Sequence, residues 1–176
     1  MNKPLLLSIM KKQLFLLLAT ICTLTASAQT DSTRLPAYKR FPSLPPVKLL
    51  LTDSVRYFTK DNFSKKEPVL IILFNPDCEH CQKETEELLD SMDHFKNVQI
   101  VMATMMPFDK MIAFYKRYKL ANYNNIVVAQ DTQYFLPVFY MVSNLPYLAL
   151  YNKKGELIRT FEGAVPIHEV IEEFNK

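Results

Sequence analysis

The sequence predicts an α/β sandwich built on a mixed central sheet. Strand-like apolar runs alternate along the chain with segments of helical periodicity, which is typical of helices layered on a partly parallel sheet. Residues 68–74, PVLIILF, form a continuous apolar run of strand length, as expected for a strand that is covered on both faces. Two strand-like segments close to the C-terminus flank a glycine turn, and this antiparallel hairpin makes the predicted sheet mixed.

Residues 1–28 have the layout of a secretory signal peptide. Two lysines precede an apolar run at 14–24, and a small-residue Ala-Ser-Ala site ends at Ala28. The run is about half of the ~20 residues that a membrane-spanning helix needs, so cleavage after export is favoured over a permanent anchor. Lipid attachment at Cys22 is the less favoured alternative, because the preceding residue is Ile21 rather than a small one. We therefore expect an exported, most simply periplasmic, protein.

Removal of this segment changes the charge and the cysteine content. Three of the 21 Lys and Arg residues lie in 1–28, which leaves 18 against 18 Asp and Glu. A near-zero charge without a basic cluster argues against nucleic-acid binding. The chain has two glycines and no glycine-rich phosphate loop, so no nucleotide cofactor, and no cofactor of another kind, is expected. Cys78 and Cys81 are the cysteines that remain.

Residues 29–46 contain several prolines, and we expect them to be an extended lead-in to a domain at 47–176. The remaining elements follow in order. From Cys78 to Phe95, apolar residues recur at steps of three and four, which predicts a helix running to about residue 94. The other predicted elements are a hairpin of strands 47–51 and 55–59, strand 97–105, helix 108–120, strand 124–130, a short helix at 134–141, strands 147–151 and 156–161, and a final helix at 166–174.

The CEHC sequence at 78–81 lies where the strand 68–74 meets its helix, at the sheet edge where sites gather in α/β folds. Thiolates are the reactive form of cysteine, and a helix N-terminus favours negative charge on Cys78. Cys81 would lie one turn deeper and be shielded. His80 would stabilise the Cys78 thiolate further, whereas the acidic Glu79 and Asp77 would oppose it.

Taken together, these features resemble the thioredoxin superfamily, and more closely its exported TlpA/ResA-type thiol–disulfide oxidoreductases. The resemblance rests on VLIILFNPD, CEHC, the following QKE, the block LPYLALYNKKGELIRTFEG and the terminal helix. It implies a three-layer sandwich. Two departures are Asp77, where the group usually has tryptophan, and Ile72, at the position of the buried acid of classical thioredoxins.

The resemblance also implies roles for residues outside the cysteine pair. Glu84 matches the buried acid of the TlpA/ResA type, whereas its helical position alone would leave it a solvated acid like its neighbours. The Leu145–Pro146 bond is expected to be cis and to face the cysteines, with Leu145 contacting substrate.

The expected function is therefore that of an exported thiol–disulfide oxidoreductase acting through Cys78 and Cys81. Its partners would be exported thiol or disulfide proteins and a redox partner, which could be membrane-bound; a monomer is expected. One alternative is a copper- or zinc-binding protein, although a structural zinc site needs four ligands. Another is a thiol peroxidase, which needs a hydroxyl residue about one turn before Cys78, where Asn75, Pro76 and Asp77 stand.

Overall fold

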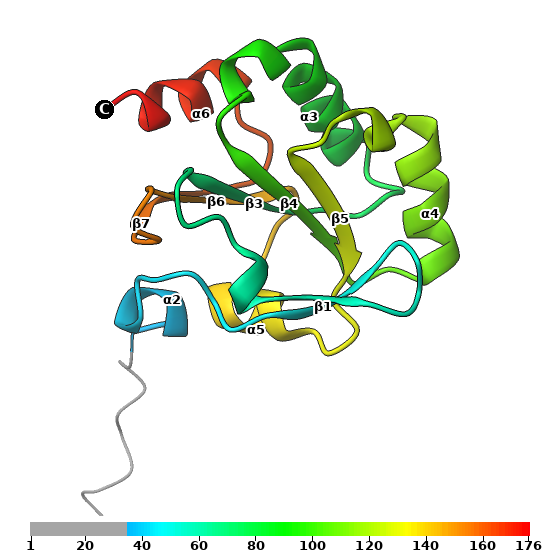
Figure 1. Cartoon of the computed structure of the whole chain (residues 1–176), viewed down its shortest axis with the longest axis horizontal. Coiled ribbons are helices and arrows are strands. Elements are labelled where there is room, and N and C mark those ends of the chain that lie inside the picture. Colours follow the sequence, from blue (N-terminus) through cyan, green and yellow to red (C-terminus); the bar gives the residue numbers. More distant parts are fainter. Residues whose placement is uncertain (1–34) are drawn as a thin grey trace, which may run out of the picture. The chain divides into compact units, whose positions relative to one another are not determined.

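A mixed sheet of seven strands forms the centre of the computed structural model, which describes residues 35–176 (Figure 1). The strand order is β2-β1-β5-β4-β3-β6-β7, with β3, β4 and β5 parallel and the other neighbours antiparallel. The predicted α/β architecture with a mixed sheet is confirmed. The strands are β1 Lys48–Leu51, β2 Tyr57–Thr59, β3 Val69–Leu73, β4 Gln99–Thr104, β5 Ile126–Gln130, β6 Tyr147–Tyr151 and β7 Leu157–Glu162.

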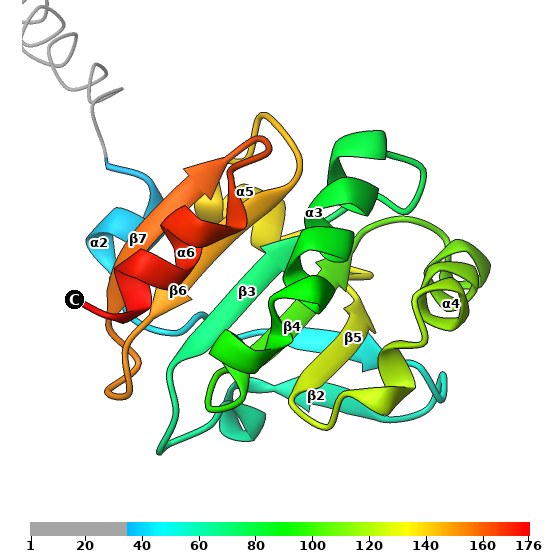
Figure 2. The same cartoon turned by 90° about the horizontal axis from the view of Figure 1, so that it is seen from above.

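Helices cover both faces of this sheet and complete three layers. Residues of α3, α4 and α6 share one apolar core with one face of the sheet, and residues of α2 and α5 share a second core with the other. Figures 1 and 2 show α3 and α6 together on one side of the sheet, with α5 on the opposite side. The helices are α2 Ala37–Arg40, α3 Glu79–Asp90, α4 Phe108–Arg117, α5 Phe135–Tyr140 and α6 Ile167–Phe174, with 3₁₀ turns at Lys60–Asn62, Met92–Phe95 and Leu120–Asn122.

Strand β3 lies between β4 and β6, and this central position explains its unbroken apolar sequence. Its side chains alternate between the two cores: Val69, Ile71 and Leu73 belong to one, Leu70 and Ile72 to the other. All five residues are buried. Because side chains of a strand point alternately to opposite faces, a strand covered on both sides must be apolar at every position.

Helix α3 follows β3 and presents one face to the core. Its buried residues are Cys81, Glu84, Thr85 and Leu88, of which Cys81, Thr85 and Leu88 have the spacing of four and three that helical periodicity predicts. The helix ends at Asp90, so the predicted extension to residue 94 is wrong.

The break after α3 has a local cause. The N–H of Ser91 is shared among the carbonyl groups of Glu87, Leu88 and Leu89, which tightens the last turn. A 3₁₀ turn then continues the chain, and it still buries Phe95 in the same core.

The segment before β1 also differs from its prediction. Residues 37–40 form a helical turn instead of extended chain, because the carbonyl of Pro36 accepts hydrogen bonds from the next turn. Leu44 is buried, and its N–H donates to the carbonyl of Gly155, whose φ of +75° forms the β6–β7 turn. The compact unit consequently begins at Pro36.

The predicted signal peptide at 1–28 lies outside the described residues. Within 35–176, none of the helices has the length and apolar character needed to cross a membrane.

Candidate active site

The two cysteines lie at the junction of β3 and α3, as the sequence predicts. The chain leaves β3 through a turn in which the N–H of Cys78 donates to the carbonyl of Asn75, at 3.1 Å. Cys78 is the N-cap residue of α3 and is half-buried. The first turn of a helix has N–H groups without partners in the helix, and such an end is a favourable environment for negative charge in general.

Cys81 differs from Cys78 in exposure and in its ability to ionise. Only 1% of Cys81 is exposed, and its Sγ accepts a hydrogen bond from the N–H of Asn75, at 3.5 Å. Burial raises the pKa of the Cys81 thiol to about 12, against the lowering effect of the Asn75 N–H, and the nearby Cys78 and Glu84 raise it further. Both cysteines are free thiols. At neutral pH, Cys81 is therefore a protonated thiol.

Glu84, one turn further along α3, is a buried carboxyl group beside Cys81. The residue is 4% exposed, its Oε2 accepts a hydrogen bond from the N–H of Val165 at 3.3 Å, and its buried Oε1 has no partner within the described chain. Burial raises the pKa of Glu84 to about 7, with a smaller contribution from the charge of Glu87 and an opposing one from Val165. At neutral pH, this carboxyl group can both take up and release a proton.

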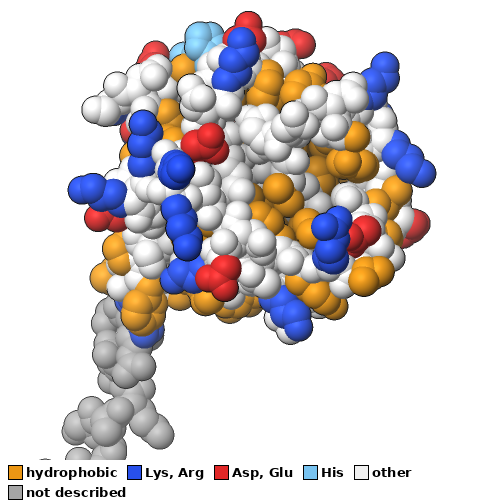
Figure 3. All heavy atoms as spheres, in the orientation of Figure 1, with side chains coloured by type: hydrophobic (Ala, Val, Ile, Leu, Met, Phe, Trp, Pro, Cys, Tyr) orange, Lys and Arg blue, Asp and Glu red, His pale blue; other side chains and the backbone are white. Residues whose placement is uncertain are grey.

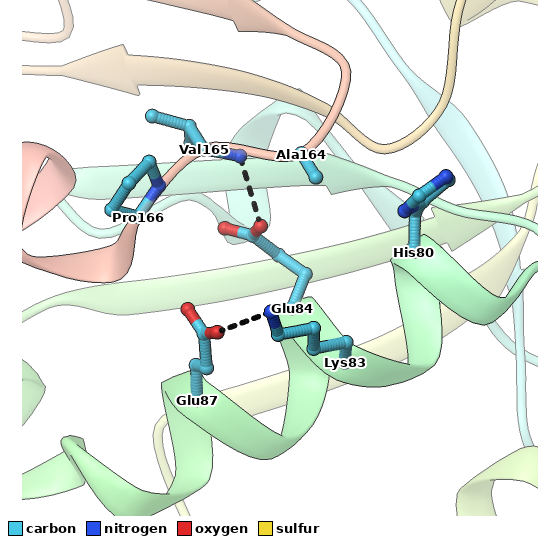
Figure 4. A pocket seen from close by; sticks show the side chains of 7 residues that line it. All are labelled: His80, Lys83, Glu84, Glu87, Ala164, Val165 and Pro166. Atoms are coloured by element: carbon cyan, nitrogen blue, oxygen red, sulfur yellow. Dashed lines mark hydrogen bonds and ion pairs between the residues drawn. The ribbon is translucent and has the colours of Figure 1, made fainter.

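Glu84 also lines a surface pocket of about 230 Å³ (Figure 4). One wall is the segment 164–166, which leads into α6, and the other is formed by side chains of α3. His80 lies at one end of the pocket, and Lys83 forms an ion pair with Glu87 at 3.7 Å. Glu84 thus acts electrostatically on the buried thiol and also lines a pocket that contains other ionisable groups.

The strand register places Leu145 and Pro146 at the sheet edge from which the cysteine turn departs. Tyr147, the first residue of β6, pairs with Leu73, the last residue of β3, so the segments beyond these two residues leave the sheet at the same edge. The Leu145–Pro146 peptide bond is cis. Pro146 is buried, and the half-buried Leu145 contacts both cores, including the one against which Cys78 packs.

The charges near Cys78 are arranged differently from the sequence-based expectation. Glu79 and His80 are exposed, as is Asp77. The carboxylate of Asp77, however, is paired with the ammonium group of Lys110 on α4. The hydrogen bond and charge of Asp77 raise the pKa of Lys110. Sequence reasoning missed Lys110, because 33 positions separate the partners and no motif links them.

Two further features concern metal binding, which the sequence left as an alternative, and nucleic-acid binding, which it argued against. Within 35–176, no three His, Cys, Asp or Glu side chains are grouped so that they could hold a metal ion. On the face drawn in Figure 3, Lys and Arg side chains are interspersed with Asp and Glu.

Solved structures with the same fold include several bacterial proteins. One is a secreted disulfide oxidoreductase of Mycobacterium tuberculosis homologous to Escherichia coli DsbE, with 17% identity, a TM-score of 0.61, and coverage of 73% of this chain and 93% of that one. StoA of Bacillus subtilis has 17% identity and a TM-score of 0.53, over 73% of this chain and 97% of that one. The exposed lipoprotein thioredoxin of Streptococcus pneumoniae has 18% identity and a TM-score of 0.55, over 73% and 98% of the two chains. At these identities, the likeness concerns the fold.

Comparison with curated protein sequences gives no match. The family model described as a thioredoxin-like domain matches residues 59–176, which include the whole junction of β3 and α3 and everything that follows it. The chain therefore belongs to the thioredoxin-like domain family.

Proposed function

We propose that this protein is an exported thiol–disulfide oxidoreductase that exchanges disulfides with other exported proteins through Cys78 and Cys81. The observation that carries the proposal is the difference between the two thiols. Cys78 is the N-cap residue of α3 and is half-buried, whereas Cys81 is buried one turn below and has a raised pKa. An accessible nucleophile followed by a shielded second thiol is the arrangement that disulfide exchange requires.

The electrons and protons of this exchange are accounted for by the cysteines, the substrate and water, without a bound cofactor. The thiolate of Cys78 attacks one sulfur of a substrate disulfide and forms a mixed disulfide, and the other substrate sulfur leaves as a thiolate that takes a proton from water. Cys81 loses its proton and attacks the sulfur of Cys78, so the second substrate sulfur leaves in the same way. The substrate gains two electrons, and the protein holds a Cys78–Cys81 disulfide that a dithiol partner reduces. The reverse sequence oxidises a dithiol substrate.

Glu84 is the proton acceptor in the second step of this scheme. A thiol whose pKa is about 12 ionises too rarely at neutral pH to attack quickly, so a base beside it is needed. Glu84 lies within the electrostatic reach of Cys81 and, with a pKa of about 7, is about half ionised at neutral pH. Its carboxylate takes the proton of Cys81 and releases it to the pocket that it lines together with His80.

Other residues bind the substrate or adjust the charge around Cys78. The backbone of Leu145, held by the buried Pro146, would pair with an extended substrate segment next to Cys78. Glu79 and His80, exposed between the two cysteines, adjust the stability of the thiolate in opposite directions.

Two observations support an exported location: the signal-like segment at 1–28, and the location of two proteins with the same fold. The M. tuberculosis relative is described as secreted and that of S. pneumoniae as an exposed lipoprotein. An exported oxidoreductase would meet disulfide-containing proteins there, because disulfides persist outside the reducing cytosol.

The proposal is tested by equilibrating the protein with glutathione buffers and measuring the fraction of the Cys78–Cys81 disulfide by mass. We expect a single two-electron transition within the range of about −270 to −120 mV that related enzymes span. The protein should also catalyse thiol exchange of a disulfide-bonded peptide, and Cys78→Ser should abolish this catalysis. Absence of catalysis by the wild type, or tight stoichiometric binding of zinc or copper that blocks both thiols, would overturn the proposal.

A further inference from the structure

A carboxylate at the end of β7 holds the loop that leads to Leu145. Oε1 of Glu162 accepts two backbone hydrogen bonds, from the N–H of Ser143 at 2.6 Å and from the N–H of Asn144 at 2.7 Å. Successive N–H groups that converge on one anionic oxygen form a charge-assisted contact, which is stronger than a hydrogen bond between neutral groups.

The sheet register explains why Glu162 reaches this loop. Glu162 pairs with Tyr147 across β6 and β7, and Tyr147 pairs with Leu73 across β6 and β3. The three residues therefore form one row along the sheet edge from which the cysteine turn departs. The next residue, Gly163, has a φ of +82°, and its N–H donates to the carbonyl of Pro146 at 2.9 Å.

The loop between α5 and β6 has packing support at Val142 and Leu145 but little at the two residues between them. It begins at Met141, which is exposed and has a φ of +55°, in the left-handed region that few side chains favour. Ser143 and Asn144 are both exposed, so their side chains contribute little packing. Val142 contacts one core, and Leu145 contacts both. The carboxylate of Glu162 consequently fixes the part of the loop that packing leaves free.

We propose that Glu162 is a positioning residue for substrate binding, which orders the 143–144 backbone and so presents Leu145 to an extended substrate segment. The inference rests on the proposed function and deepens it. Glu162 acts on binding and not on the thiols, because its hydrogen bonds reach the loop and not the turn that carries Cys78. A loop that is already ordered costs less conformational entropy when the substrate binds.

The test compares Glu162→Ala and Glu162→Gln with the wild type in steady-state exchange of a disulfide-bonded peptide. Glu162→Ala should raise KM roughly five- to tenfold with kcat held within about twofold, since both charge-assisted contacts are lost. Glu162→Gln keeps an oxygen acceptor without the charge and should give an intermediate KM. Glu172→Ala and Glu172→Gln, at an exposed position of α6, are the matched controls and should leave KM unchanged.

Two further readouts separate positioning from a structural or redox role. The Cys78–Cys81 potential and the rate of Cys78 alkylation should be the same in Glu162→Ala as in the wild type, and thermal unfolding should shift by only a few degrees. An unchanged KM, or a fall of kcat together with a changed potential, would overturn the inference while leaving the proposed function intact. A wild type without exchange activity would overturn the proposed function itself, and the inference with it.

Discussion

Replacing Glu84 by glutamine should change how the stability of the reduced protein depends on pH. Folding raises the pKa of Glu84 from its ordinary value of 4.5 to about 7, chiefly because the carboxyl group is buried. The folded protein therefore holds this proton more tightly than the unfolded chain. The contribution of Glu84 to the free energy of unfolding is therefore greatest below pH 4.5. It falls as the pH rises from 4.5 to 7 and is constant above that window.

The size of this change in stability follows from the two pKa values of Glu84, in the unfolded chain and in the folded protein. A tenfold change in a protonation equilibrium is worth about 1.4 kcal/mol, so the folded state loses about 3 kcal/mol between pH 4.5 and pH 8 through Glu84. Glutamine has no charge to bury and keeps an oxygen that can accept the N–H of Val165. The variant should therefore match the wild type near pH 4 and exceed it by about 3 kcal/mol at pH 8.

Urea unfolding followed by circular dichroism at pH 4.5, 6, 7 and 8 measures this difference, with both cysteines kept reduced. Other titrating groups are common to the two proteins and cancel, and the Cys81 thiol, with a pKa of about 12, stays protonated throughout. Glu86→Gln, at an exposed position of the same helix, is the control and should show no such difference. A constant difference between Glu84→Gln and the wild type, or one that falls as the pH rises, would refute the burial of a carboxyl group at this site.

Three further predictions concern packing, charge and export. Leu88→Ala should lower the free energy of unfolding by about 3 kcal/mol, because Leu88 is fully buried between α3 and the sheet; a loss below about 1 kcal/mol would contradict this packing. Lys110→Met should slow alkylation of Cys78 at pH 7 by roughly twofold at low salt, since Asp77 then opposes the thiolate, and the difference should vanish at 1 M salt. An equal rate at low salt would show that the ion pair does not act on Cys78. The exported protein should begin at Gln29 and carry no lipid, which intact-mass measurement decides; the mass of a lipidated form would disprove it.

The parts of the fold that local patterns determine were predictable from the sequence. The apolar run of β3 indicated a strand buried on both faces, and the three- and four-residue spacing from Cys81 to Leu88 indicated the face that α3 buries. The turn at Gly155 was predictable because so few residues adopt a positive φ. Each of these features depends on neighbours in the chain.

The features that no local pattern in the sequence indicates depend on distant residues. Glu84 is buried because Val165, 81 positions later, lies over it, and helical geometry alone gave no reason to separate it from the solvated acids beside it. The family resemblance pointed to Glu84; the pattern of α3 did not. Lys110 and Glu162 likewise meet their partners through the tertiary fold, so no spacing in the sequence indicates either contact.

The central claim is that Cys78 attacks substrates and Cys81 releases them, and trapping of mixed disulfides by single variants tests it most directly. Cys81→Ser should accumulate mixed disulfides with a disulfide-bonded peptide and with exported proteins, because the attack that would resolve them is gone. Cys78→Ser should trap almost none, because the remaining thiol is buried and has a raised pKa. Non-reducing gels and mass spectrometry give the trapped fraction for each variant. Equal trapping by the two variants, or greater trapping by Cys78→Ser, would contradict these roles.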